Sequence, residues 1–475
     1  MSKEVKDTAE QAAPKRSNQP KTPTLVRGMK DILPSEQGYW RLVEETVRQV
    51  AMEYRYEQIE TPVLEPAALF NRTIGKETDV LEKEMYTFTD RSNESLALRP
   101  EGTAGVARAY LEHGMLNQPQ PVKVFYIESF FRHDRPQAGR YRQFFQFGFE
   151  AIGDAHPVVD AQIISMTYEV FRRLQVPVNV HMNSLGDKES RAAYEKALLD
   201  YYKSHKSELC EDCLRRMQKN PLRLLDCKQT GCRTLAETAP QTVDHLNTES
   251  REHFVSVLEY LDELEIPYTL DPRIVRGLDY YSKTAFEFLP VLSEGDDRVI
   301  ELGGGGRYDG LIEQIGGRAT PAVGAACGIE RLINRLHEQG VQAQALPDAD
   351  VFLAQLGDPA RKLSIKLFGE LSAQGVRVAE SLSKDGIKPQ LEAANRVNAK
   401  YTLILGQKEM MDGTILIRDM ENGIQEVVDM QKIVNEVVKR LQRGKSQQLQ
   451  AADPEVVAKM EEESGVSEAQ QKLDL

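Results

Sequence analysis

The chain has 475 residues, of which 41% are hydrophobic, and a formal net charge of -13, so it is long enough to bury more than one hydrophobic core. This acidity argues against non-specific nucleic-acid binding, which needs clustered Lys and Arg, and restricts any RNA contact to a local surface. No run reaches the roughly 18 apolar residues of a membrane helix, and the first residues lack a secretory signal. Five cysteines are too few for a disulfide framework. We therefore expect a cytoplasmic protein without membrane contact.

The N-terminal region begins with a polar segment and continues with a predicted helix. Residues 1–23 contain almost no large apolar side chains, which predicts a disordered N-terminal arm. Ser35 is a plausible N-cap for a helix that continues to about Tyr54. One face of that helix is apolar, and it carries Trp40, Val43, Val47 and Val50. A strand follows and ends at Pro62.

Two later segments carry polar side chains, one at a helix start and the other at the tip of a hairpin. Residues 97–103 follow a short strand and open a helix, where Glu101 can stabilise the N-terminal dipole. Residues 122–152 read as two strands joined by a polar loop at 133–140. Four arginines surround the tip of this hairpin, at positions 132, 135, 140 and 142. Arginine suits bidentate binding of phosphate and carboxylate, although a salt-bridged hairpin tip is the alternative.

The region from about 187 to 261 is mostly helical with polar faces, and it carries two cysteine pairs. Cys210 and Cys213 form one pair, and Cys227 and Cys232 form the other. Four thiolates could hold zinc tetrahedrally. Because the first pair falls on a helical pattern, unligated cysteines are the favoured interpretation and a structural zinc site is the alternative.

Three segments near the middle of the chain are rich in glycine, arginine or tyrosine. Residues 276–281 read RGLDYY, a dense polar set followed by a predicted strand. Residues 301–310 contain four consecutive glycines, which permit close approaches that other residues forbid but lack the ending of a Walker loop. Residues 322–331 read as a small-residue strand that runs into a helix and ends at Arg331.

The C-terminal part has a different pattern. A linker at 342–349 precedes strands that alternate with helices over 350–443, which predicts a small three-layer α/β domain. Residues 444–475 read as a flexible acidic tail.

Two of these segments resemble signatures of the histidyl-tRNA synthetases, which are class II aminoacyl-tRNA synthetases. They are RGLDYY and the hairpin phrase FRHDRPQAGRYRQF at 131–144, and the resemblance covers roughly residues 24–443. It implies an α+β catalytic domain at 24–341, built on an antiparallel sheet with a helical insertion, and an anticodon-binding α/β domain at 350–443. It also implies a homodimer that uses the helix after Ser35. Phe145 departs from the family, which usually has histidine before the glutamine.

The implied activity is histidine-tRNA ligation, in which ATP and Mg²⁺ activate L-histidine before its transfer to the 3′ end of tRNA(His). The resemblance assigns catalytic roles to Arg276 and Arg132, and ATP binding to Arg132, Arg140 and Arg331. It assigns histidine binding to Glu101, Thr103, Gln146, Glu150, Arg276, Tyr280, Tyr281 and Tyr308. Within that set, Glu150 and Tyr281 would offer an acceptor and a donor to the two imidazole nitrogens. The alternative activity is that of a non-catalytic regulatory subunit of ATP phosphoribosyltransferase.

Overall fold

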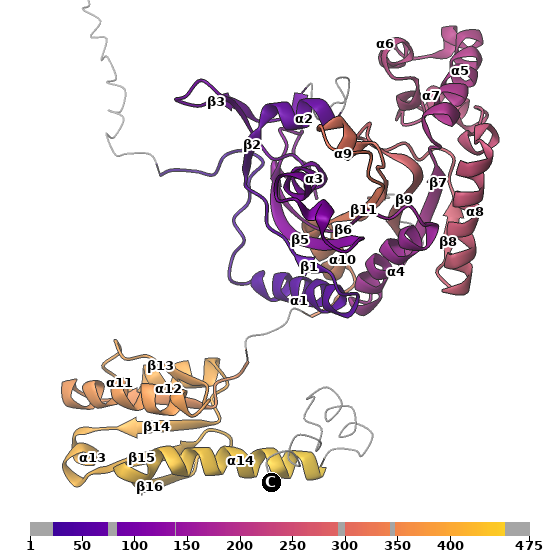
Figure 1. Cartoon of the computed structure of the whole chain (residues 1–475). Helices are drawn as coiled ribbons and strands as arrows, with labels where there is room; N and C mark the ends of the chain where they lie inside the picture. Colours follow the sequence, from indigo (N-terminus) through magenta and orange to yellow (C-terminus); the bar gives the residue numbers. More distant parts are fainter. Residues whose placement is uncertain (1–21, 75–82, 138, 293–299, 343–346, 452–475) are drawn as a thin grey trace, which may run out of the picture. The chain divides into compact units, whose positions relative to one another are not determined.

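The computed structural model describes residues 22–74, 83–137, 139–292, 300–342 and 347–451, without the side chains of 444–451. These residues form two compact units that divide between positions 344 and 345 (Figure 1). Each unit has hydrophobic clusters of its own and is described by itself.

The first unit is built on an eight-stranded sheet with the order β1-β5-β6-β11-β10-β9-β7-β8. Its outermost pairs, β1 with β5 and β7 with β8, are parallel, and the pairs between them are antiparallel. This confirms the expected antiparallel catalytic sheet. The strands are β1 (Glu57–Gln58), β5 (Val122–Phe131), β6 (Gln143–Ile152), β7 (Val178–Ser184), β8 (Tyr268–Leu270), β9 (Ser282–Pro290), β10 (Gly303–Arg307) and β11 (Ala322–Gly328).

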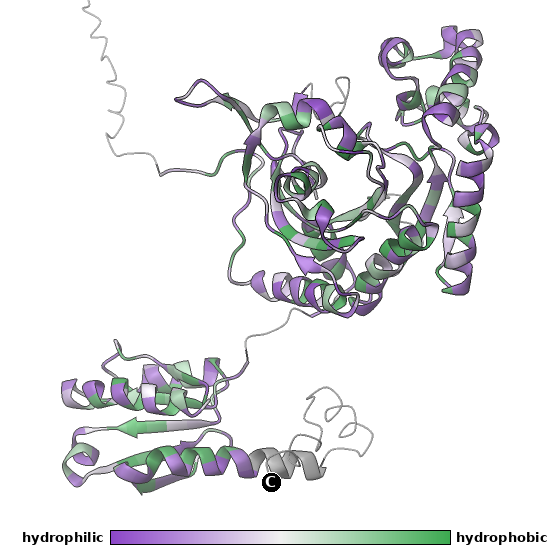
Figure 2. Cartoon of the chain, viewed as in Figure 1, coloured by the Kyte–Doolittle hydropathy of each residue, from purple (hydrophilic) through white to green (hydrophobic). Residues whose placement is uncertain are grey.

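One face of this sheet is covered by long helices. Odd-numbered residues such as Phe147, Phe149 and Val323 point to this face and join one large hydrophobic cluster. The helices that complete the cluster are α1 (Gln37–Glu53), α4 (Pro157–Arg173), α8 (Thr248–Glu263) and α10 (Ile329–Glu338). Figure 2 shows hydrophobic residues gathered on the strands and on the helix faces turned toward them.

The opposite face is only partly covered and carries the candidate site. Val124, Tyr126 and Ile152 lie there in a smaller cluster with helix α3 (Thr103–Glu112) and helix α9 (Leu311–Gln314). Beside it, α2 (Ala67–Thr73) packs on a small sheet formed by β2 (Leu64–Pro66), β4 (Ser95–Leu98) and β3 (Thr87–Thr89).

One expectation about the first helix needs correction. Ser35 does not cap it, because α1 begins at Gln37 with Glu36 at the N-cap and no side-chain capping bond. Its apolar face is buried within the chain, where Val43, Val47 and Val50 are fully buried and α1 packs on α4 and α10. That face is therefore not available for contact with a second chain.

The helical insertion has its own small core. It contains α5 (Lys188–Ser204), α6 (Glu211–Lys219), the 3₁₀ turn η4 (Pro221–Leu224) and α7 (Thr230–Glu237). Helix α8 falls inside the range expected for the insertion, but Phe254, Val257 and Leu261 pack in the main cluster of the catalytic sheet. The separate insertion core therefore ends before α8.

The second unit is a five-stranded sheet with the order β13-β12-β14-β15-β16. Helix α12 (Ile387–Arg396) covers one face, while α11 (Asp358–Ala373) and α14 (Ile433–Ala451) cover the other, which confirms a three-layer α/β fold. The strands are β12 (Val351–Gln355), β13 (Val378–Glu380), β14 (Tyr401–Leu405), β15 (Thr414–Asp419) and β16 (Gln425–Asp429). Strand β16 and the short helix α13 (Gln407–Asp412) were not predicted.

The expected flexible segments lie mostly outside the described residues. This applies to 1–21 of the N-terminal arm, 343–346 of the linker and 452–475 of the acidic tail. The beginning of the tail is not flexible coil, because α14 continues to Ala451. Among the described residues, no helix is both long enough and apolar enough to cross a membrane.

Candidate functional site

The candidate site lies on a strip of sheet that has almost no side chains. The register of β6, β11 and β10 places Gly148, Gly304, Gly306 and Gly324 on the same face. We call these four residues the glycine floor. Ordinary residues at these positions would project onto the face that carries the polar groups.

Each glycine of the floor leaves room for one large side chain. A Cβ at position 304 would lie 2.6 Å from Nη1 of Arg276, and a Cβ at position 306 would lie 3.0 Å from the ring of Tyr281. A Cβ at position 324 would overlap the Glu150 carboxylate, and one at position 148 would overlap the ring of Tyr126. The glycines are therefore required by close approach, and polar side chains lie flat on the sheet.

Glu150 is the most deeply buried acid of the site. It lies on β6 and is 1% exposed. Its Oε2 accepts a hydrogen bond of 2.5 Å from Tyr308, and its Oε1 accepts bonds from Thr103 at 2.8 Å and Tyr126 at 3.4 Å. Burial raises the pKa of Glu150 to about 8, although these three donors act in the opposite direction. The carboxylate is thus held by donors within a largely apolar enclosure.

Glu101 lies beside this acid at the beginning of α3. Its carboxylate accepts backbone N–H bonds from Thr103 at 2.7 Å and Ala104 at 2.9 Å, so it does serve the helix N-terminus. The hydroxyl of Tyr280 also donates to it at 3.4 Å. Burial raises the pKa of Glu101, and the two N–H bonds oppose that shift. The helix-start role therefore coexists with a position in the pocket.

Arg276 lies between the carboxylates of Glu287 and Glu301, which the sequence analysis did not predict as site residues. Its Nη1 donates to Glu287 at 2.9 Å and to Glu301 at 3.1 Å. Its guanidinium lies 5.4 Å from the ring centroid of Tyr281, in cation–π geometry. Among the described residues its buried Nε has no hydrogen-bond partner. Arg276 therefore retains one free donor direction.

Three arginines gather at the open side of the sheet. Arg331 donates from Nη1 to the Glu301 carbonyl at 2.6 Å, and Arg132 donates from Nε to the Pro100 carbonyl at 2.8 Å. Burial lowers the pKa of Arg331, and the positive charges of Arg140 and Arg132 contribute to the same shift. These arginines are close enough to repel one another, and a polyanion would relieve that repulsion. Arg142 instead donates to the Arg27 carbonyl at 3.2 Å.

The structure distributes the predicted residues over adjoining parts of one site. Gln146 lies on the same face of β6 as Glu150, four residues earlier, as strand alternation requires. The hydroxyl of Tyr308 donates a hydrogen bond to Glu150. Tyr126 was not predicted, although alternation along β5 places it directly across from Gly148.

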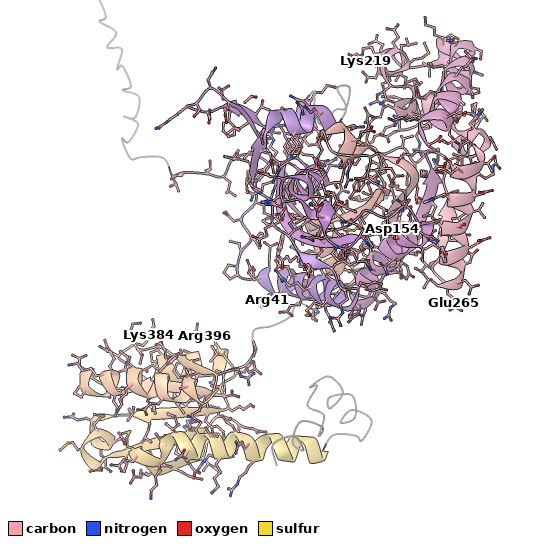
Figure 3. All side chains as sticks on the ribbon, viewed as in Figure 1. Arg41, Asp154, Lys219, Glu265, Lys384 and Arg396 are labelled. Carbon is pink, nitrogen blue, oxygen red and sulfur yellow. The ribbon has the colours of Figure 1, made fainter. Side chains whose placement is uncertain are left out.

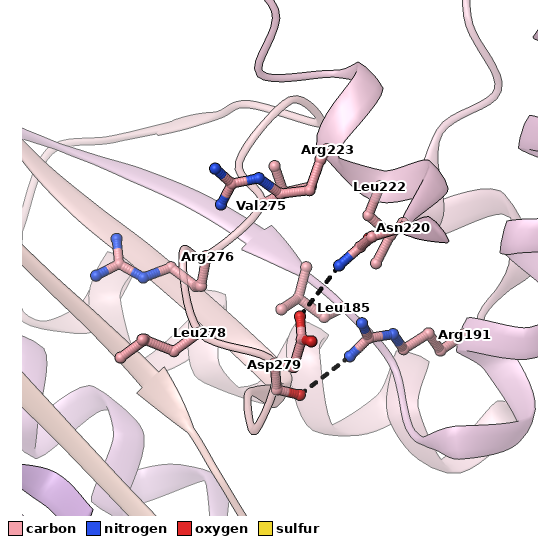
Figure 4. A pocket seen from close by; sticks show the side chains of 9 residues that line it. All are labelled: Leu185, Arg191, Asn220, Leu222, Arg223, Val275, Arg276, Leu278 and Asp279. Carbon is pink, nitrogen blue, oxygen red and sulfur yellow. Dashed lines mark hydrogen bonds between the residues drawn. The ribbon is translucent and has the colours of Figure 1, made fainter. Parts of the chain in front are cut away.

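The helical insertion contacts the RGLDYY segment at Asp279. Figure 4 shows a pocket in which Asn220 and Arg191 hold Asp279, with Arg223 and Arg276 on its wall. Asn220 Nδ2 donates to Asp279 Oδ1 at 3.2 Å, and Arg191 donates to the Asp279 carbonyl at 3.3 Å. These bonds connect the insertion to the segment that carries Arg276.

The insertion also brings the four predicted cysteines together. The Sγ atoms of Cys210, Cys213, Cys227 and Cys232 all lie within 4.8 Å of one another. The fifth cysteine, Cys327, is buried separately in β11, as core packing requires.

A buried ion pair behind the glycine floor was also missed. Arg307 and Asp160 are both fully enclosed and share hydrogen bonds of 2.5 to 3.1 Å. His253 completes the group at 3.2 Å from Asp160. No spacing in the sequence connects these positions, which lie on β10, α4 and α8.

Comparison with known families gives two matches that together span most of the chain. Residues 28–332 match the model described as histidyl-tRNA synthetase. Residues 350–440 match the model described as an anticodon binding domain.

Curated relatives and solved structures agree with these matches. A histidine–tRNA ligase of Dehalococcoides mccartyi is 45% identical over 87% of this chain and 99% of its own length. One from Geobacillus is 45% identical over 88% of this chain and 99% of its own. The apo S. aureus histidyl-tRNA synthetase structure aligns with a TM-score of 0.74 at 36% identity, and covers 88% of this chain and all of that one. A Bacillus halodurans structure titled as an ATP phosphoribosyltransferase regulatory subunit/histidyl-tRNA synthetase is 20% identical, with a TM-score of 0.58, and shows a shared fold.

Proposed function

The chain belongs to the histidyl-tRNA synthetase family and is an aminoacyl-tRNA synthetase, and on that premise we propose that the pocket on the glycine floor is its histidine and adenylate site. The enzyme activates L-histidine with ATP to histidyl-adenylate and diphosphate, and transfers the histidyl group to the 3′ end of tRNA(His). The observation that carries the proposal is the convergence of Glu101, Glu150 and Arg276 on one face of the sheet. The regulatory-subunit alternative is not favoured, because the curated relatives that span 99% of their own length are ligases.

The acidic end of the pocket binds the amino group and the imidazole of histidine. Glu101, with Thr103 and Gln146 nearby, accepts the substrate ammonium. Glu150 accepts an imidazole N–H. A carboxylate has about four acceptor positions, so Glu150 can accept this bond beside those from Tyr308 and Thr103. A wrong side chain would leave these buried groups unpaired, which gives strong discrimination without editing.

The other imidazole nitrogen requires a donor from the tyrosine group. The family resemblance assigns this role to Tyr281, whose ring packs at 4.8 Å from Tyr280 and lies over the floor at Gly306. Tyr308 takes a different role, because its hydroxyl already donates to Glu150. We therefore assign Tyr308 to orienting the carboxylate and retain Tyr281 as the imidazole donor.

Arg276 serves the reacting centre of the first step. In that step the histidine carboxylate attacks the α-phosphate, and negative charge develops on the phosphate oxygens. A guanidinium fixed by Glu287 and Glu301 is already oriented, so it stabilises this charge without reorganisation. Its unpartnered Nε supplies a donor for the bridge between carboxylate and phosphate.

The arginines at the open side bind the rest of ATP. Arg132 and Arg331 are fixed by backbone carbonyls, and Arg140 is paired with Asp134 at 3.3 Å. Their mutual repulsion in the free protein favours binding of a triphosphate. We therefore assign Arg132, Arg140 and Arg331 to ATP phosphates.

The residues present fit the Mg²⁺ that the reaction uses. Glu287 and Glu301 place two carboxylates against one guanidinium nitrogen, and carboxylate oxygen is the ligand type that Mg²⁺ prefers. Burial, together with the negative charge of Glu301, raises the pKa of Glu287 to about 7. These two acids would hold the ion, which would neutralise charge on the ATP phosphates.

The second unit, which we take as residues 350–443, binds the anticodon part of tRNA(His). Although the chain is acidic as a whole, this unit has exposed basic side chains on and beside α12, including Lys384, Lys388 and Arg396. Lys384 and Arg396 project from the same edge of the unit in Figure 3. Such a local basic group suits contact with phosphates.

The enzyme is assigned to the cytoplasm as a homodimer. Because the apolar face of α1 is used within the chain, the dimer contact must use other surfaces. Exposed apolar side chains at Leu64 and Phe88, which share one face of the small sheet β2-β4-β3, supply such a surface. Sedimentation equilibrium checks the assignment, and a monomer at micromolar concentration would refute it.

Exchange of labelled diphosphate into ATP, with each proteinogenic amino acid supplied in turn, tests the function. We expect exchange with histidine alone. Exchange with another amino acid, or with none, would overturn the assignment.

A further inference from the structure

The four cysteines of the insertion form a compact sulfur cluster, which we call the thiol cluster. Its Sγ atoms lie within 4.8 Å of one another, and those of Cys210 and Cys227 are 3.9 Å apart. In a tetrahedral zinc site with Zn–S bonds of about 2.3 Å, the sulfurs lie roughly 3.8 Å apart. A disulfide needs about 2.05 Å, so the sulfurs are spaced for a shared cation rather than for covalent pairs.

The backbone around the thiol cluster is arranged to favour negative sulfur. Cys210 is the N-cap of α6, and Cys213 follows in the first turn of that helix. Cys232 lies in the first turn of α7 and accepts the Cys210 backbone N–H at 3.4 Å. Two helix N-termini therefore flank the cluster and stabilise thiolates. The helical pattern at Cys210 and Cys213 therefore does not argue against zinc, because α6 begins at Cys210 and both cysteines lie at the start of the helix.

The cluster is poorly suited to remain as four free thiols. Three of its members are buried, so their sulfurs meet one another rather than solvent. The surrounding packing is a small satellite core in an insertion of short helices. Short helices with little apolar area gain much of their stability from a metal when they hold one.

We propose that Cys210, Cys213, Cys227 and Cys232 bind one Zn²⁺ ion as a closed four-thiolate site that holds the insertion together. A closed site with four protein ligands leaves no position for substrate, so the role of the zinc is structural. Zinc is preferred over harder cations because all four ligands are sulfur.

This site lies close to the catalytic segment in space, because Val275 packs against the core that contains the cysteines. The ligands Cys213 and Cys227 bracket η4, and η4 together with the residue before it supplies Asn220 and Arg223 to the pocket of Figure 4. Asn220 holds Asp279 of the RGLDYY segment. Zinc would therefore position Asp279, and through it Arg276, and this second part rests on the proposed function.

Metal analysis tests the site without reference to activity. The full-length protein, expressed with zinc supplied and purified without chelator, is expected to contain about one zinc per chain. Titration of its thiols with a mercurial reagent should release that zinc in parallel with cysteine modification. Replacement of zinc by Co²⁺ should give the intense visible bands of tetrahedral thiolate coordination. Absence of zinc from the wild-type protein, or iron in its place, would overturn the proposal.

Two variants give a matched comparison. Cys227→Ser should lose most of the zinc, whereas Cys327→Ala removes a buried cysteine outside the cluster and should retain it. Equal zinc content in both variants would also overturn the proposal. If Cys227→Ser does not fold, the Co²⁺ spectrum and the mercurial titration of the wild-type protein still decide the question.

The positioning role has a separate readout. Removal of zinc from the wild-type protein should open residues 205–230 to limited proteolysis and lower kcat for histidine-dependent exchange more than it raises the KM for histidine, and added zinc should reverse both changes. Opening of the insertion without any change in kcat would refute the positioning role alone. If the protein has zinc but no histidine-dependent exchange, the proposed function fails and the metal site stands.

Discussion

Glu150 and Gly324 face each other across β6 and β11, and the Glu150 carboxylate occupies the space that a Cβ at position 324 would fill. The glycine and the acid therefore depend on each other. Because position 324 has no side chain, the carboxylate from the neighbouring strand can lie against the sheet. The same relationship joins Gly304 to Arg276 and Gly306 to Tyr281.

Gly324→Ala should disable histidine recognition. The added methyl would displace Glu150, and a displacement of about 1 Å in an active site costs roughly 100-fold in kcat/KM. The measurement is histidine-dependent diphosphate exchange as a function of histidine concentration. Gly369→Ala is the control, because a Cβ at position 369 meets nothing within 4 Å. Wild-type kinetics in Gly324→Ala would contradict the role of the glycine floor.

Glu150→Gln should change how stability depends on pH. The pKa of Glu150 is about 8 in the folded protein against an ordinary value of 4.5, so the folded state holds a proton that the unfolded state releases. Stability from this group is full below pH 4.5 and is lost as pH rises through 8, by on the order of 4 kcal/mol. Glutamine cannot ionise and should avoid that loss.

Thermal unfolding at pH 5 and at pH 9 checks this prediction. The difference in Tm, variant minus wild type, should increase between the two pH values. Exposed Glu60→Gln is the control and should show no such trend. A constant difference for Glu150→Gln would refute it. The same variant should raise the KM for histidine while that for ATP changes little.

Asp160→Ala should be strongly destabilising. It would remove the fully buried partner of Arg307 and leave this arginine with the partly exposed Asp309, and breaking a buried pair in this way costs about 3–5 kcal/mol. The hydrogen bond from His253 and the charge of Arg307 lower the pKa of Asp160, although burial acts in the opposite direction. The stability that this carboxylate contributes is therefore present above its ordinary pKa of 3.8, and it is lost as the pH falls through the lowered pKa of the folded state. Urea unfolding at pH 7 measures the cost. Asp200→Ala removes an exposed pair and should hardly move the midpoint. Equal midpoints would refute the prediction.

Removal of residues 345–475 should separate the two steps of the reaction. The second unit has its own hydrophobic clusters, so the cut leaves the first sheet intact. Histidine-dependent exchange should persist in part, while charging of tRNA(His) should fall much further. Equal losses in the two assays, with a folded fragment, would show that this unit is not a tRNA module.

The fold was predictable where local pattern and tertiary environment agree. The strands β12, β14 and β15 lie in the range 350–443 for which alternating strands and helices were predicted, because each is a short apolar run between turns. Strand β16 was missed because it is almost fully exposed and has no apolar alternation. Ser35 has the right chemistry for an N-cap, but the helix begins one residue too late for it to serve.

The residues of the site were predicted through the family resemblance, whereas their partners were not. Glu287 and Glu301 reach Arg276 from β9 and from the residues before β10, and only strand register brings them together. The ion pair of Arg307 and Asp160 depends in the same way on how α4 packs on the sheet. The cysteine spacing predicted that the four thiols could share a metal, and the structure brings them within 4.8 Å of one another, whereas the helical pattern could not show that α6 begins at Cys210.

Diphosphate exchange by Arg276 variants tests the central claim most directly. If Arg276 stabilises the charge that develops on the α-phosphate, Arg276→Ala should lower the histidine-dependent exchange rate by about 1,000-fold with the fold preserved by circular dichroism. Arg276→Lys should recover little of it, because lysine lacks the planar fork. Wild-type exchange rates in the alanine variant would contradict the account.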